Sequence, residues 1–174
     1  MFWRRRARKS YRDVVEDLAA EAFAVDLLKL PGFETATVEP MLNTLEGVAA
    51  LNFLLTRALA TPQHEVHIQL AITHLQLVLI DELAESYSPQ EMVDLVIPLL
   101  ERRHTEYSKL LNGDGAPGDR IIDCGRTMIE NFCDVSLAEP AMSLAAGALF
   151  KFVAIDAGRK VRELDAEKAI DWTE

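Results

Sequence analysis

The sequence predicts an all-α protein, a single-domain bundle of about six helices around a buried central helix. The 174 residues fit one domain, and their composition, 49% hydrophobic and 26% charged, is that of an ordinary globular protein. Proline and helix-capping residues divide the chain into helix-length segments. Within these segments apolar residues recur at helical spacing, and nothing in the chain has the pattern of a strand series.

The first two helices are predicted from their starts and from their apolar spacing. Residues Ser10 to Asp13 resemble a capping box, and apolar residues at helical spacing follow them as far as Leu30, before Pro31. A second helix is expected over about residues 39–60. Its apolar residues cover most of its circumference, which indicates burial on several sides, so we expect it to be the central helix.

Prolines place the next two helices. Thr61 and Pro62 offer an N-cap and a first-turn proline for a third helix. The stretch from Ser88 to Glu91 combines a cap, a first-turn proline and a capping glutamate, and it is the clearest helix start in the chain. Pro98 lies inside this fourth helix and should either bend or break it. The helix is expected to end at Asn112, where NGDGAPGD predicts a connecting loop.

Two further helices are expected, over about 119–134 and from Ser136 to about residue 157. The final stretch either extends the last helix or breaks it at Gly158. Residues 141–148 are mostly small, and small side chains let helix backbones approach closely. This predicts a helix packed tightly inside the bundle, and the alternative is a homodimer contact made in the same way.

The charge of the chain is unevenly placed. Residues 1–10 form a basic, aromatic N-terminal segment, and the helical bundle domain is expected over 11–174. The segment's cations are attracted to an anionic membrane, and its aromatic rings suit the headgroup region. The same groups would suit an acidic protein or single-stranded RNA, or form a solvated tail that folds back on the body. The candidate partner- or membrane-contact residues are Phe2, Trp3, Arg4, Arg5, Arg6, Arg8 and Lys9.

The body of the protein is acidic. Six of the 18 Lys and Arg lie in residues 1–12, which leaves 12 against 28 Asp and Glu from Asp13 onward, a net charge of −16. Such a surface repels the phosphates of duplex nucleic acid, so that partner is not expected. It favours a protein partner that is basic.

The two cysteines indicate a reducing compartment. Cys124 and Cys133 lie nine residues apart, and on one helix they would point to opposite sides, too far apart for a disulfide. Arg120 and Arg126 flank Cys124 and would lower its pKa, although a helical cysteine is more often a core residue. No secretory signal is visible. We therefore expect a cytoplasmic protein, peripheral to a membrane if its N-terminus binds one.

Four residues form a candidate metal site. His64 and His67 are three residues apart and would be neighbours on a helix surface. Glu101 and His104 form an E-x-x-H motif, of which di-iron bundles use two, whereas only one is found here.

His67, His74 and Asp81 are spaced seven residues apart and would lie along one stripe of a helix. Successive members would stand about 10.5 Å apart along the axis, so they cannot share one metal ion. We interpret the stripe as the edge of the buried face.

The sequence contains no nucleophile elbow, P-loop or dinucleotide-binding motif, and no catalytic residue or cofactor is predicted. It favours a non-enzymatic, soluble helical interaction protein (an adaptor, regulator, assembly factor or immunity-type inhibitor) that binds a protein partner through its acidic surface. Two alternatives stay open. One is a metal-binding bundle with His and Glu ligands, and the other is a peripheral membrane protein attached by its N-terminus.

Overall fold

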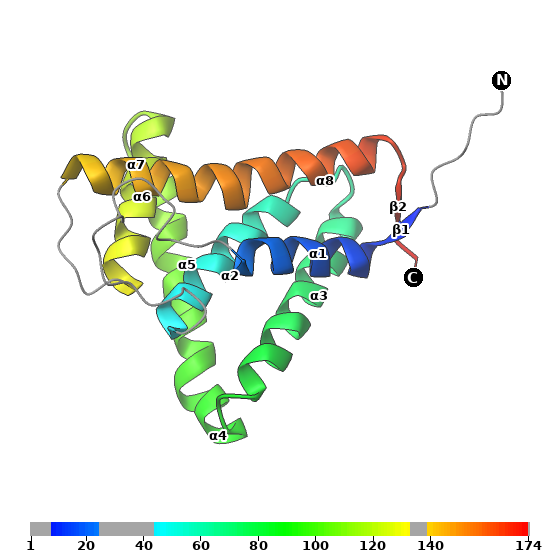
Figure 1. Cartoon of the computed structure of the whole chain (residues 1–174), viewed down its shortest axis with the longest axis horizontal. Coiled ribbons are helices and arrows are strands. Elements are labelled where there is room, and N and C mark those ends of the chain that lie inside the picture. Colours follow the sequence, from blue (N-terminus) through cyan, green and yellow to red (C-terminus); the bar gives the residue numbers. More distant parts are fainter. Residues whose placement is uncertain (1–7, 25–43, 133–138, 174) are drawn as a thin grey trace.

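The computed structural model describes residues 8–24, 44–132 and 139–173, and these form an all-α bundle (Figure 1). The elements α4, η3 and α5 form one continuous helix, and α7, η4 and α8 form another, each with a π-helical turn inside it. The described part therefore contains six continuous helices, as expected. The elements are β1 (Lys9–Ser10), α1 (Tyr11–Phe23), α2 (Leu45–Leu59), α3 (Glu65–Ala84), α4 (Pro89–Glu91), η3 (Met92–Val96), α5 (Ile97–Leu111), α6 (Pro117–Phe132), α7 (Glu139–Leu149), η4 (Phe150–Asp156), α8 (Ala157–Ala166) and β2 (Ile170–Asp171).

Helix α2 is the central helix, which confirms the prediction. Eleven of its 15 residues are buried, and it packs against α1, α3, α5, α6, η4 and α8. It begins at Leu45, later than predicted, because Thr44 has an extended backbone and its side chain accepts a hydrogen bond from the Gly47 amide. Apolar residues on every side of α2 therefore place the core along this helix.

Two of the predicted helix starts have different outcomes. Ser10 caps α1 by accepting a hydrogen bond from the Arg12 amide, and the predicted continuation of this helix toward Leu30 lies outside the described residues. The predicted start of the third helix at Pro62 is wrong, because α3 begins at Glu65. Thr61 instead donates a hydrogen bond to the Ala58 carbonyl at 2.8 Å, so it closes α2 rather than opening α3.

Pro98 neither breaks its helix nor ends it. The capping box at Ser88 opens the helix as predicted, and the backbone stays helical from α4 through η3 to the end of α5. Proline lacks an N–H, and its ring crowds the carbonyl four residues earlier. The wider π turn lies just before the proline, where the Ile97 amide bonds to the Met92 carbonyl five residues back. The helix therefore accommodates Pro98 by widening one turn.

Helices α6 and α7 pack closely at Gly125. A Cβ added to Gly125 would lie 2.8 Å from the Ala146 Cβ, so only glycine fits there without a shift of the backbone. Ala145 and Ala146 are fully buried. Ala145 and Ala146 therefore pack inside the bundle, as predicted, whereas Leu144 is exposed and Gly147 and Ala148 are half-buried, so the homodimer alternative stays a prediction. The helix continues through η4 and Gly158 and ends at Ala166.

The two ends of the described chain meet. Strands β1 and β2 pair in parallel, with Lys9 opposite Ile170 and Ser10 opposite Asp171 (Figure 1). Lys9 and Ser10, which the sequence assigns to the N-terminal segment, thus belong to the folded body.

Candidate functional site

Helix α3 is apolar on two opposite faces. One face, made of residues four apart, is buried in the core and consists of Ala71, Leu75, Leu79 and Leu83. On the other face Val66 is 67% exposed, Leu77 53% and Ile80 43%. Val66 and Leu77 are about three turns apart, and Leu77 points about 200° away from Leu75, so the exposed residues form their own stripe. Exposed apolar side chains gathered along one face of a helix make that face a candidate interaction surface, although the exposed Gln69 and Thr73 lie between Val66 and Leu77.

The same helix is, among the described residues, the one long and apolar enough to cross a membrane by length and composition. A mostly buried core helix of a soluble protein passes that test as well, whereas 22% of the apolar window of α3 is buried. Here α3 packs against α1 and α2, and it carries polar side chains such as His67, His74 and Gln76. We therefore treat its exposed face as a surface of the bundle.

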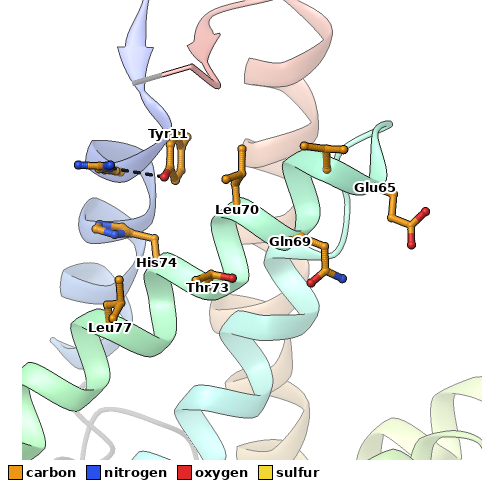
Figure 2. A pocket seen from close by; sticks show the side chains of 9 residues that line it. Tyr11, Glu65, Gln69, Leu70, Thr73, His74 and Leu77 are labelled. Carbon is orange, nitrogen blue, oxygen red and sulfur yellow. Dashed lines mark hydrogen bonds between the residues drawn. The ribbon is translucent and has the colours of Figure 1, made fainter.

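A groove of about 570 Å³ lies along this stripe and extends onto α1 (Figure 2). We call it the α1–α3 groove. Figure 2 shows Tyr11 of α1 beside Leu70 and His74 of α3, while Leu77 and Glu65 lie toward opposite ends of the drawn part of α3. Its apolar members are Tyr11, Val66, Leu70 and Leu77, and its polar members are Arg12, Glu65, Gln69, Thr73 and His74.

Hydrogen bonds fix two of the polar members. The His74 Nε2 atom lies 2.9 Å from a carboxylate oxygen of Glu16, which holds the imidazole against α1. The Arg12 Nε atom donates to the Tyr11 hydroxyl at 3.4 Å, and this contact raises the pKa of the Arg12 guanidinium. The tyrosine ring at the end of the groove is therefore held by its own neighbour.

The surroundings of the groove are mainly acidic. Glu65 lies in its lining, Asp13 is exposed next to Arg12, and Asp81 is exposed one turn beyond Leu77. None of these three carboxylates forms an ion pair with another described residue. The groove thus presents an apolar floor bordered by these three carboxylates and by one cation, Arg12, and this excess of negative charge suits an amphipathic ligand carrying positive charge.

His67 lies in an aromatic cluster beside the groove. Its ring stacks on Trp172, with centroids 4.3 Å apart and planes 5° from parallel, and Tyr11 lies 6.0 Å from the same indole. Trp172 donates its Nε1 hydrogen to Asp165 at 3.0 Å. The His67 Nδ1 atom is 3.8 Å from the same carboxylate oxygen, which is beyond hydrogen-bonding distance. His67 therefore belongs to the contact that joins α3, α8 and the C-terminal strand.

The four residues of the candidate metal site do not come together. His64 contacts His67, with ring centroids 5.0 Å apart, whereas Glu101 and His104 line a separate cleft on α5. Among the described residues, no group of three or more His, Cys, Asp and Glu is placed to hold a metal ion. On the stripe of α3, His67 and His74 are half-buried and Asp81 is exposed, as expected at the edge of a buried face.

Of the N-terminal candidates, Phe2, Trp3 and Arg4 to Arg6 lie outside the described residues. Arg8 and Lys9 are exposed. The Lys9 ammonium lies 2.7 Å from the Asp17 carboxylate, and this ion pair raises the pKa of Lys9 and lowers that of Asp17. At least one cation of the segment is therefore paired with the acidic body.

Cys124 is an unreactive core residue. It is fully buried, and its thiol contacts the Tyr107 carbonyl at 3.7 Å. Burial raises its pKa to about 12, although the positive charge of Arg57 acts in the opposite direction. The thiol is therefore protonated near neutral pH, which is contrary to a reactive role. Cys133 lies outside the described residues.

No protein-family model, curated protein or solved structure matches this chain. The chemistry of the groove is thus inferred from its own residues. The sequence reasoning missed this groove because it assigned α3 a single buried face. The sequence pattern that would have predicted the groove is the stripe of Val66, Leu70 and Leu77. This stripe lies opposite Leu75 and gives the helix two apolar faces.

Proposed function

We propose that this protein is a non-enzymatic helical interaction protein, of the adaptor or regulator type, that binds a protein partner in the α1–α3 groove. The observation that carries the proposal is that the exposed side chains of Val66 and Leu77, together with the half-buried Leu70, line that groove. Full burial of an exposed side chain of this size is worth about 1.5–3 kcal/mol, and these partly exposed side chains leave part of that free energy unused. A partner that covers them recovers this free energy.

The proposed partner segment is an amphipathic helix that carries lysine or arginine. Helix-in-groove recognition places apolar anchors at three- and four-residue spacing against an apolar floor. The acidic surroundings, with Asp13, Glu65 and Asp81 free of ion pairs to other described residues, complement cations beside those anchors. The net charge of −10 adds long-range attraction, which speeds association and weakens as salt rises.

The test is a pull-down with the tagged full-length chain at low and high salt, followed by titration of the recovered partner's helical segment. The groove variant is Leu77→Asp, which places a charge on the apolar floor. The matched control is Leu144→Asp, since Leu144 is also an exposed leucine, at 62%, but lies on α7 away from the groove.

We expect the wild-type chain and Leu144→Asp to bind the segment equally. Leu77→Asp should bind it at least tenfold more weakly, a loss of about 1.4 kcal/mol. Equal binding by Leu77→Asp, or an association rate that does not change with salt, would contradict the proposal. Pelleting of the wild type, but not of Leu77→Asp, with phosphatidylserine vesicles would also overturn it, because the groove would then be a membrane contact.

A further inference from the structure

A second cleft, of about 470 Å³, opens between α2, α3 and α5. We call it the α2–α3–α5 cleft, and it shares no lining residue with the α1–α3 groove. Figure 1 shows α3 and α5 diverging from α4, and α2 packs against both. Its polar members come from all three helices and are Asn52, Thr56, Gln76, Glu101, His104 and Thr105.

Asn52 is the one buried polar residue among those described, and it lies on the apolar central helix. A buried amide is costly unless it is hydrogen-bonded. Its Oδ1 atom accepts a hydrogen bond of 2.8 Å from the Gln76 Nε2 atom. An amide side chain has donors and an acceptor, and this bond leaves the Asn52 Nδ2 donor and the Gln76 Oε1 acceptor without a partner in the described part of the chain.

The other polar members have unused hydrogen-bonding capacity as well. The side chains of Thr56, Glu101 and Thr105 form no hydrogen bond or ion pair with another described residue. The His104 ring packs edge-on against Phe53, with centroids 5.2 Å apart. Small-molecule sites are typically concave, with a few polar groups that converge between apolar walls. Here Ile72 and Leu100 supply the apolar part.

The charge of the lining selects the class of ligand. Glu101 is the one carboxylate among the lining residues, and neither lysine nor arginine is among them, although Glu101 and Thr105 also line an adjoining hollow that contains Arg102 and Lys109. The nearby Arg103 is engaged by Glu46, through two contacts of 2.7 Å, and by Glu106. We infer that the α2–α3–α5 cleft binds a primary alkylammonium group. Its N–H donors would bond to the Glu101 carboxylate and the Gln76 carbonyl oxygen, and its alkyl chain would pack on the apolar part of the cleft.

An alkylammonium group can come from a free amine or from a lysine side chain of a protein. Both are tested by NMR titration of the full chain, with n-butylammonium and with Nα-acetyl-lysine amide, and with butyrate as the anionic comparison. The site variant is Glu101→Gln, a change at an exposed position that removes only the charge. The matched control is Glu130→Gln, since Glu130 is an exposed carboxylate on α6.

We expect saturable binding of one or both cations, with the largest shifts at the side-chain amide signals of Asn52 and Gln76. Glu101→Gln should weaken binding about tenfold, whereas Glu130→Gln should leave it unchanged. Tighter binding of n-butylammonium assigns the cleft to a free amine, and tighter binding of the lysine amide assigns it to a lysine of a partner protein.

The inference is overturned if neither cation binds saturably, if butyrate binds as tightly, or if Glu101→Gln binds as well as the wild type. It does not rest on the proposed function, because the groove is a different surface. Leu77→Asp should bind n-butylammonium as the wild type does, so failure of one proposal is distinguishable from failure of the other.

Discussion

At the scale of single residues, the close packing of α6 against α7 depends on the missing side chain of Gly125. The space around this glycine is occupied by the Ala146 Cβ, Cα and carbonyl oxygen, at 2.8, 3.0 and 3.1 Å from where a Cβ would stand. Two of these three atoms are backbone, so the clash cannot be relieved by a change of rotamer. Gly147, on the facing helix, has nothing within 4 Å of its Cβ position.

Gly125→Ala should therefore destabilise the protein, by about 1–3 kcal/mol, because α6 and α7 must move apart. Gly147→Ala is the matched control and should be neutral or stabilising by up to about 1 kcal/mol, since alanine is the better helix former. Urea unfolding followed by circular dichroism gives both free energies of unfolding. Equal stabilities for the two variants would mean that α6 and α7 do not pack as closely as described.

Residue-scale contacts were predictable where they are local. The caps at Ser10 and Ser88 follow from hydrogen bonds within three residues, so the sequence pattern decides them. The stacking of His67 on Trp172 was not predictable, because helical spacing places His67 at an edge of α3 without indicating which distant segment covers it. The rings of His64 and His67 do lie together, as their spacing predicts, but Glu101 and His104 lie in a separate cleft, because spacing within one helix does not indicate which other helices lie beside it.

At the scale of elements, the long helix containing Pro98 shows how a proline is tolerated inside a helix. The turn η3 has π geometry, and Ile97 bonds to the carbonyl five residues back. Pro98 is exposed, so its ring displaces no core contact. The remaining cost is the hydrogen bond that its nitrogen cannot donate.

Pro98→Ala should stabilise the protein by about 1–2 kcal/mol, less than the full helix-interior cost of proline, about 3 kcal/mol, because the π turn already relieves the clash. Pro89→Ala is the control, since Pro89 occupies the first turn, where proline is favourable. That change should be neutral or destabilising by about 0.5 kcal/mol. Thermal unfolding of the two variants tests this, and a loss of stability in Pro98→Ala would show that the π turn depends on the proline.

The sequence predicted elements well where one pattern dominates. Helix α2 is apolar on every side, so its central position followed from composition and spacing alone. Helix α3 is also apolar around most of its circumference, yet much of it is exposed, because α1 and α2 cover only part of it. Periodicity gives the apolar faces of a helix but not the number of neighbours available to bury them. The α1–α3 groove results from this difference and therefore required the three-dimensional structure.

At the scale of the whole molecule, the C-terminal strand closes the bundle. Strand β2 pairs with β1, and Trp172 then places its ring between Tyr11 of α1 and His67 of α3 while bonding to Asp165 of α8. One side chain thus joins three helices that are far apart in the sequence. Tyr11 also lines the α1–α3 groove, so the same contact positions one end of the proposed binding surface.

Removing this contact should loosen the bundle and the groove together. Trp172 is partly exposed, so Trp172→Ala should cost about 2 kcal/mol of unfolding free energy, less than the 3–5 kcal/mol typical of a fully buried tryptophan. Trp172→Phe keeps an aromatic ring but loses the hydrogen bond to Asp165, and it should cost about 1 kcal/mol. Urea unfolding of the wild type, Trp172→Ala and Trp172→Phe gives the order of their free energies of unfolding. The partner segment should also bind more weakly to Trp172→Ala, because Tyr11 loses its stacking neighbour. If Trp172→Ala unfolds at the wild-type urea concentration, the C-terminal strand does not hold the helices together.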